Sequence, residues 1–324
     1  MVKKSPKSSK KSSKISKKSL KKSLKNTLKN TLKNTLKYAH NGTSMCAPNI
    51  TQTLSNQTCY TDEKLIKMRK YWNNRHPDMK IHVDNPIQIW SELKKFIGGV
   101  CNTEQCWLKQ QFIKDTNDVE LLNYTFATDS PISWKTNPTE WLSSIDIENV
   151  MKQYEHAYSS FQFIGPSPID FDNKIHGECV WNELCNFDIN KYIKKGHYKI
   201  GFVFNTDPHY LNGSHWISLF LNTKKKYIYY FDSMGNPVPK QIDILINKIS
   251  NQCKEIGIQL TRFDNIIQHQ KLNTECGMYC LYFIIQSIID KPNNITNRIT
   301  DEEMISFRKV FFNPSDKEDT FIDE

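Results

Sequence analysis

The uneven distribution of charge constrains the fold of this chain more than any other feature of its sequence. Residues 1–40 hold 14 Lys and no Asp or Glu, whereas the rest of the chain holds 30 basic and 34 acidic side chains. A segment of like charges with few apolar residues cannot bury enough surface to offset the conformational entropy lost on folding. The sequence therefore predicts a disordered basic tail over residues 1–45 and a folded body with a net charge of −4.

A repeated four-residue unit gives the tail a second property. The unit recurs as SLKK, SLKN, TLKN, TLKN and TLK, which spaces five leucines four residues apart, at Leu20, Leu24, Leu28, Leu32 and Leu36. On a helix each step of four residues turns about 400°, so these leucines would form one apolar stripe. We expect the lysines to bind nucleic acid or another anionic surface through counterion release, and the bound tail to become helical. The alternative is a solvated tail without a ligand.

The composition of the body favours a soluble intracellular protein. No apolar run approaches the 18 or so residues that span a membrane, and the tail lacks the apolar centre of a secretory signal. Nine cysteines are an odd number without the spacing of a small disulfide-bonded scaffold, so we expect reduced thiols. Cys101 with Cys106, and His176 with Cys179 and Cys185, could supply metal ligands, but the spacings are loose and no CxxC pair occurs. We therefore predict neither a metal ion nor a cofactor.

The hydrophobic pattern divides the body into two regions. Residues 46–130 begin with a linker rich in Asn, Thr and Ser and then contain three candidate helices, over 62–72, 87–96 and 103–112. In residues 131–324, helices are expected over 141–154, from 237 and over 276–289, and strands over 198–204, 215–221, 227–232 and 264–270. A mixed sheet flanked by helices is the simplest architecture for this order. We predict an α+β domain over 131–324 that follows a helical region over 46–130.

Two polar residues stand at corresponding ends of adjacent predicted strands. His215, in the motif GSHW, begins one strand, and Asp232, in the motif FDS, ends the next. The short turn over 223–226 predicts an antiparallel pair, which brings the start of the first strand to the finish of the second. We therefore expect His215 and Asp232 to be neighbours. The alternative role for Asp232 is to cap the turn that follows it.

A cysteine at the start of an apolar helix completes a catalytic set. Cys276 begins the predicted helix, where the helix dipole and an imidazolium would both favour the thiolate. Gln270, six residues earlier, could place its amide beside the backbone N–H of Cys276 and stabilise an oxyanion. Gly277 would let a substrate approach closely, whereas Cys280 is expected to belong only to the core. The predicted catalytic residues are His215, Asp232, Gln270 and Cys276.

In chain order, the motifs HW, FDS and Q-x5-C-G resemble those of the ubiquitin-like-protein proteases, the family that includes SUMO proteases and adenain. The resemblance covers roughly residues 137–290, and the added helical region with its Lys- and Asn-rich composition is most similar to the polyprotein-processing proteases of African swine fever virus and other large DNA viruses. It implies the cysteine-protease fold of that family. It also implies that Trp141 covers the glycines of a substrate, with Trp216 and Gly277 as further substrate-binding residues. Glu275 departs from the family, because SUMO proteases generally carry Asp before the nucleophile.

The resemblance implies a thiol endopeptidase that cleaves polypeptides at Gly-Gly-X sites and processes viral polyproteins during virion maturation. The expected location is the virion core and the host cytoplasm. Three other activities stay open: an isopeptidase that removes SUMO or ubiquitin-like modifiers, an acetyltransferase that uses the same triad, and a binding module without catalysis. The intact Cys, His, Asp and Gln argue against the last of these.

Overall fold

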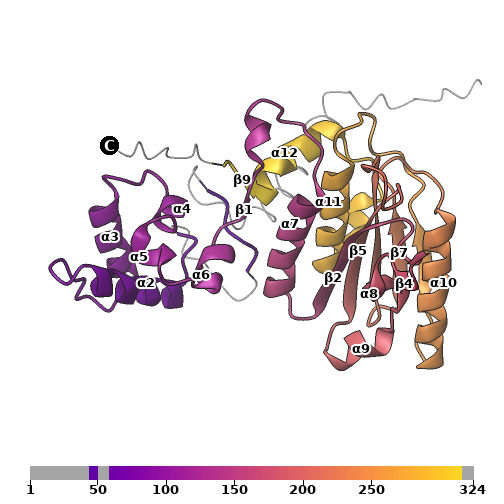
Figure 1. Ribbon diagram of the computed structural model, residues 1–324, viewed down its shortest axis with the longest axis horizontal. Coiled ribbons are helices and arrows are strands. Elements are labelled where there is room, and N and C mark those ends of the chain that lie inside the picture. The colour runs from indigo at the N-terminus through magenta and orange to yellow at the C-terminus, as the bar shows by residue number, and fades with distance from the viewer. Residues whose placement is uncertain (1–43, 50–57, 316–324) are drawn as a thin grey trace, which may run out of the picture. The chain divides into compact units, whose positions relative to one another are not determined.

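The computed structural model describes residues 44–49 and 58–315, so the predicted basic tail, apart from its last two residues, lies outside the described residues. The helical region contains five helices among these residues (Figure 1), namely α2 (Asp62–Arg75), α3 (Pro86–Ile97), α4 (Glu104–Trp107), α5 (Gln111–Lys114) and α6 (Val119–Asn123). Side-chain caps stabilise the starts of the first two helices. The Thr61 side chain accepts from the Lys64 N–H, and the Asn85 side chain, just before the proline that begins α3, accepts from two N–H groups of the first turn. These helices enclose an apolar core of their own.

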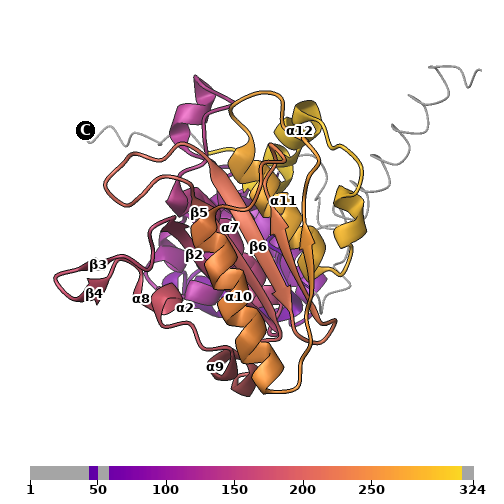
Figure 2. The same cartoon turned by 90° about the vertical axis from the view of Figure 1, so that its right-hand side faces the viewer.

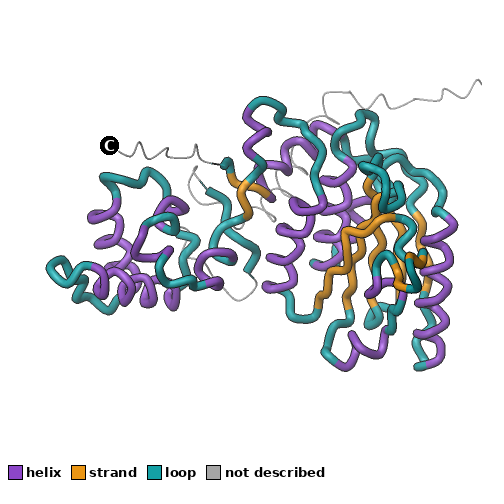
Figure 3. The backbone as a smooth tube through the Cα atoms, in the orientation of Figure 1, coloured by secondary structure: helices purple, strands orange, loops and turns teal. Residues whose placement is uncertain are grey.

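A five-stranded mixed sheet forms the centre of the second region (Figure 3), with strands in the order β2-β5-β6-β7-β8. Their bounds are β2 (Phe161–Pro168), β5 (Lys199–Asn205), β6 (Trp216–Asn222), β7 (Tyr227–Phe231) and β8 (Thr261–Asp264). The two outer pairs, β2 with β5 and β7 with β8, are parallel, whereas β5, β6 and β7 are antiparallel. The predicted hairpin between residues 215 and 232 is therefore confirmed.

Helices cover both faces of this sheet. Helices α7 (Ser144–Ala157) and α11 (Cys276–Ile288) lie on one face, and α10 (Lys240–Glu255) lies on the other (Figures 1 and 2). Strand β6 shows how the sequence produces this, because every residue in it is buried and alternate side chains point to opposite faces. Phe220 joins the core under α11, while Leu219 and Leu221 join the core under α10.

The remaining elements are short and lie around these layers. They are β1 (Thr128–Asp129), η2 (Ile132–Lys135), β3 (Lys174–Ile175), β4 (Glu178–Cys179), α8 (Asn182–Cys185), α9 (Ile189–Lys194), η3 (Pro292–Ile295), α12 (Asp301–Phe311) and β9 (Phe312–Asn313). Strand β9 pairs in parallel with β1, and the Asn313 amide donates to the carbonyls of Met45 and Ala127. The chain after α12 is thereby hydrogen-bonded to residues that precede and that follow the five helices of the helical region.

Three predicted elements differ in the structure. The helix expected over 103–112 is two helices, α4 and α5, and the helix expected from residue 141 begins only at Ser144, because Ser143 and Asp146 form a capping box there. The strand expected over 264–270 is wrong: strand β8 ends at Asp264. The Asn265 amide donates to the carbonyls of Asp232 and Ile267, and this turns the chain away from β7.

The expectation of reduced cysteines is also wrong for six of the nine. Disulfides join Cys46 to Cys59, Cys101 to Cys106 and Cys179 to Cys185, with Cα–Cα distances of 5.2, 5.5 and 6.2 Å, within the range that a disulfide requires. The odd number of cysteines did not exclude disulfides, because three pairs still leave three free thiols, those of Cys253, Cys276 and Cys280. Four of the five candidate metal ligands, all except His176, are thus cysteines whose sulfur atoms form disulfides. Within residues 44–49 and 58–315 no group of three or more His, Cys, Asp and Glu could hold a metal ion.

None of the helices within the described part of the chain is long and apolar enough to cross a membrane.

Candidate active site

His215 and Asp232 meet at one end of the β6–β7 hairpin. His215 directly precedes β6 and Asp232 directly follows β7, so the antiparallel register places both residues at the same end of this strand pair. The Nε2 atom of His215 lies 2.7 Å from Oδ1 of Asp232, whose side chain is buried. Asp232 therefore orients the imidazole and leaves Nδ1 as the nitrogen that can exchange a proton with a third group.

The environment of His215 favours its charged form. Burial alone would lower the pKa of His215, but hydrogen bonds to Asp232 and to Cys276, together with the charges of these two groups, outweigh burial and raise the pKa to about 9. The imidazolium is thus stable near neutral pH. A cation between a carboxylate and a thiolate is the arrangement that activates a cysteine nucleophile.

Cys276 is the first residue of α11 and is only 1% exposed. Its neighbours in this helix are all buried, so the helix cannot rotate without breaking the core under it. The first N–H groups of the helix have no carbonyl partners within it, and they present a partial positive charge to the sulfur. Cys280, one turn later, is fully buried, and burial raises the pKa of its thiol well above the usual value. Cys276, unlike Cys280, is the thiol that is hydrogen-bonded to His215.

Asp232 makes the contacts of both roles that the sequence left open. Besides its bond to His215, Oδ1 accepts from the backbone N–H of Met234 at 2.8 Å, which is an Asx turn. The backbone carbonyl of Asp232 accepts from the Gly235 N–H and from the Asn265 amide. The turn after β7 is thereby fixed on both sides of the carboxylate, and the capping bond to Met234 leaves the contact with His215 in place.

Gln270 is buried beside the same turn. Its backbone N–H donates to the carbonyl of Ser233 at 2.9 Å, and its side-chain Oε1 accepts from the Ser233 hydroxyl at 2.7 Å. On the next residue, the Lys271 N–H donates to the carboxylate of Asp301. The strand predicted for this segment is absent, and side-chain hydrogen bonds hold Gln270 in its place.

The residues predicted to bind substrate fall into two groups. Trp141 keeps 39% of its side chain exposed, whereas Trp216 is buried and its indole Nε1 donates to the carbonyl of Leu142 at 2.9 Å. A Cβ at Gly277 would come within 2.9 Å of the Leu142 side chain, so Leu142 fills the space that this glycine leaves. Trp216, which follows His215, and Gly277, which follows Cys276, thus hold Leu142 between them. This clamp fixes the backbone next to Trp141 and gives Trp216 and Gly277 a supporting role.

A buried ion pair stands directly before the nucleophile. Glu275 is fully buried and accepts two hydrogen bonds from Arg308 of α12, at 2.9 and 3.0 Å. The same guanidinium donates to the backbone carbonyl of Glu140 at 2.8 Å and lies over the ring of Trp134. Arg308 therefore connects the start of α11 to the residue before Trp141. The sequence signalled Glu275 by its position but not Arg308, which lies 33 residues further on.

The known proteins that resemble this chain agree with the geometry. A model of the Ulp1 protease family, C-terminal catalytic domain, matches residues 200–320. A thiol protease of Acanthamoeba polyphaga mimivirus is 30% identical over 292 residues, which cover 83% of this chain and 93% of the relative. The chain belongs to the Ulp1 protease family. It is a cysteine protease.

Two further comparisons concern African swine fever virus. The protease is 26% identical to the SUMO-1 cysteine protease of one isolate over 254 residues, which cover 74% of this chain and 92% of the relative. A crystal structure of the protease of that virus matches with a TM-score of 0.61 and 24% identity, covering 86% of this chain and 98% of that one. The predicted α+β fold, a mixed sheet flanked by helices, is thereby confirmed.

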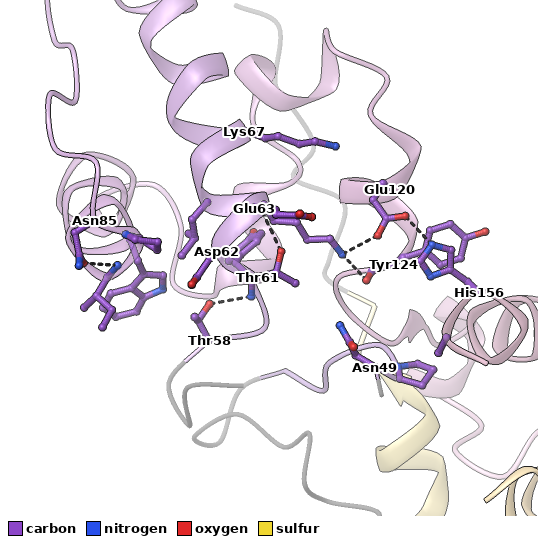
Figure 4. A pocket seen from close by; sticks show the side chains of 18 of the residues that line it. Asn49, Thr58, Thr61, Asp62, Glu63, Lys67, Asn85, Glu120, Tyr124 and His156 are labelled. Atoms are coloured by element: carbon purple, nitrogen blue, oxygen red, sulfur yellow. Dashed lines mark hydrogen bonds and ion pairs between the residues drawn. The ribbon is translucent and has the colours of Figure 1, made fainter. Parts of the chain in front are cut away.

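A cavity in the helical region lies away from the active site. It has a volume of about 960 Å³ and is lined by α2, α3 and α6 together with the end of α7 (Figure 4). Lys64 donates to the Tyr124 carbonyl at 2.6 Å and faces Glu120, whose other oxygen lies 2.7 Å from Nε2 of His156. These polar groups satisfy one another. They connect the helical region to α7, and no catalytic residue lines the cavity.

The Glu275–Arg308 pair gives a prediction for stability. Replacing Arg308 by Met leaves the Glu275 carboxylate buried without its cation, which lowers the free energy of unfolding by about 3–5 kcal/mol. Arg262→Met is the matched control, because Arg262 pairs with Asp243 and Asp264 near the surface and its loss costs about 0–1 kcal/mol. Urea unfolding followed by circular dichroism measures both.

A third variant separates charge from packing. In Arg308→Met with Glu275→Met, no charge is left buried, so part of the lost stability returns. Equal unfolding free energies for Arg308→Met and Arg262→Met would contradict a structural role for the buried pair.

Proposed function

We propose that this protease cleaves polypeptides after Gly-Gly and processes viral polyproteins during virion maturation, in the virion core and the host cytoplasm. The viral origin of the relatives, mimivirus and African swine fever virus, supports the setting. The observation that carries the specificity is the clamp on Leu142, because it holds Trp141 next to the first turn of α11. In this proposal the large, partly exposed indole of Trp141 restricts the side chains that can approach Cys276.

The proposed chemistry uses the four polar groups His215, Asp232, Gln270 and Cys276. The thiolate of Cys276 attacks the carbonyl carbon of the second glycine, and the developing oxyanion accepts from the Gln270 amide and the Cys276 N–H. His215 then donates its proton to the leaving amine as the C–N bond breaks, which leaves an acyl-enzyme. The neutral imidazole takes a proton from water, whose oxygen attacks the thioester carbonyl. The C–S bond then breaks, which restores the thiolate of Cys276 beside the imidazolium and releases the new acid, which loses its proton to solvent. Asp232 keeps the imidazole in one orientation through both steps.

The second candidate is removal of a SUMO or ubiquitin-like modifier. The relative from African swine fever virus is named a SUMO-1 cysteine protease, and this favours a modifier as an alternative substrate. The two candidates use the same acyl chemistry and differ in what lies beyond the glycines. Turnover of Gly-Gly-X peptides and of SUMO and ubiquitin fusions, compared at equal concentration, separates them. Efficient cleavage of the fusions with poor cleavage of all peptides would favour the modifier.

Replacing Trp141 by Ala tests the proposed specificity. The wild-type protease should prefer Gly-Gly-X over Gly-Ala-X by roughly 100-fold in kcat/KM, since one methyl group in a tight site is discriminated on that scale. Trp141→Ala should reduce this ratio below about tenfold. Phe263→Ala, which removes an exposed aromatic ring from the edge strand β8, is the control and should leave the ratio unchanged. An unchanged ratio in Trp141→Ala would remove this residue from the specificity site.

We also propose that the lysine-rich residues 1–40 bind nucleic acid, which would retain the protease in a virion core. The support is their charge: 14 Lys and no acidic residue. Affinity for duplex DNA, measured by fluorescence anisotropy, should fall steeply with salt and be lost when residues 1–40 are deleted, because counterion release drives it. Hydrolysis of short peptides by the truncated chain should be unchanged. Undiminished DNA binding by the truncated chain would contradict the proposal.

A further inference from the structure

An oxyanion donor of the glutamine type has an orientation problem. The two ends of its amide have nearly the same size, but only the NH₂ end can donate to an oxyanion. If the amide turned over, its carbonyl would face the developing negative charge and oppose the reaction. A site that uses Gln270 in this way, as the proposed function requires, therefore needs a group that holds the amide in one position.

In the structure, Ser233 holds the oxygen end of this amide. Its hydroxyl donates to Oε1 of Gln270 at 2.7 Å, and both side chains are buried, at 0% and 2% exposure. A buried hydrogen bond in a low-dielectric site is costly to lose, because water cannot replace the missing partner. With Oε1 bound to Ser233, the NH₂ end of the amide is directed away from Ser233.

The backbone of Ser233 fixes the same residue a second time. Its carbonyl accepts from the N–H of His269 at 2.8 Å and from the N–H of Gln270 at 2.9 Å. Three hydrogen bonds from one serine thus determine both the position of the Gln270 backbone and the orientation of its amide. In this segment, which has no regular secondary structure, these bonds replace a sheet or helix ladder.

Ser233 itself is placed by the turn that holds the catalytic aspartate. Asp232 precedes it and bonds to His215 and to the Met234 N–H, while Asn265 holds the Asp232 carbonyl. We infer that Ser233 is a positioning residue which orients the Gln270 amide toward the oxyanion, so that the adjacent residues Asp232 and Ser233 align the base and the oxyanion donor together. This inference rests on the proposed function of Gln270.

A double-mutant cycle on peptide hydrolysis tests the inference. Gln270→Ala should lower kcat by roughly 100-fold, the scale of one lost oxyanion donor. Ser233→Ala should lower kcat by roughly tenfold with little change in KM, the scale of one lost buried hydrogen bond. If Ser233 acts through Gln270, adding Ser233→Ala to Gln270→Ala should change kcat by less than about twofold. Ser233→Cys, which keeps a weak donor, should fall between wild type and Ser233→Ala.

Ser287→Ala is the matched control for the loss of a buried hydroxyl. Ser287 is also fully buried, and its hydroxyl donates to the Phe283 carbonyl at the far end of α11. This variant should retain the wild-type kcat, and thermal unfolding should show that every variant is folded.

The outcomes separate the inference from the proposed function. Equal losses from Ser233→Ala in both backgrounds, or no loss in either, would overturn the positioning role while Gln270 kept its own. An unchanged kcat in Gln270→Ala would overturn the oxyanion role and the inference with it. A wild-type protease that cleaved no Gly-Gly peptide but did cleave modifier fusions would redirect the proposed substrate, and the same cycle measured on the fusions would still decide the role of Ser233.

Discussion

The buried carboxylate of Asp232 is the constraint on which the site depends. It accepts from His215 at one end of the hairpin and from the turn backbone after β7, so one side chain fixes the direction of the base and the path of the chain that follows. Burying a carboxylate is costly unless it is paired and hydrogen-bonded. Asp232 meets both conditions only while His215 is charged and the turn is formed, and this links the protonation of the base to the local fold.

Two further contacts bring the nucleophile to this base. The apolar helix α11 packs under the sheet and presents Cys276 at its first turn, and the Glu275–Arg308 pair holds the residue before it. Leu142 then lies between Trp216 and Gly277, each of which follows a catalytic residue. The β6–β7 hairpin, the start of α11 and the segment before α7 are therefore held together by residues adjacent to His215 and Cys276. Substrate specificity and catalysis share these supports, so variants at Leu142 or Arg308 should affect both.

The sequence predicted the elements whose hydrophobic residues recur with the period of a strand or a helix. The β6–β7 hairpin and helix α11 followed from alternation and apolar continuity, and three of the residues proposed to be catalytic, His215, Asp232 and Cys276, lie at the ends of these elements. The 264–270 segment was mispredicted because Asn265 and Ser233 fix it through side-chain bonds that have no period. The disulfides and the Arg308–Glu275 pair were missed because they depend on distances in space that residue spacing does not encode. Ser233 stood in the motif FDS, but only the structure gives its partner.

The protonation of His215 tests this account most directly. The pKa of an exposed histidine is about 6.5, and the pairing with Asp232 and Cys276 raises the pKa of His215 to about 9. Because the pKa is raised on folding, the pairing stabilises the fold fully below pH 6.5, and this stability is lost as the pH rises through 9. Titration of the His215 ring by NMR should give a midpoint near 9 that falls in Asp232→Asn. A midpoint near 6.5 in the wild-type protease, unchanged in Asp232→Asn, would contradict the account.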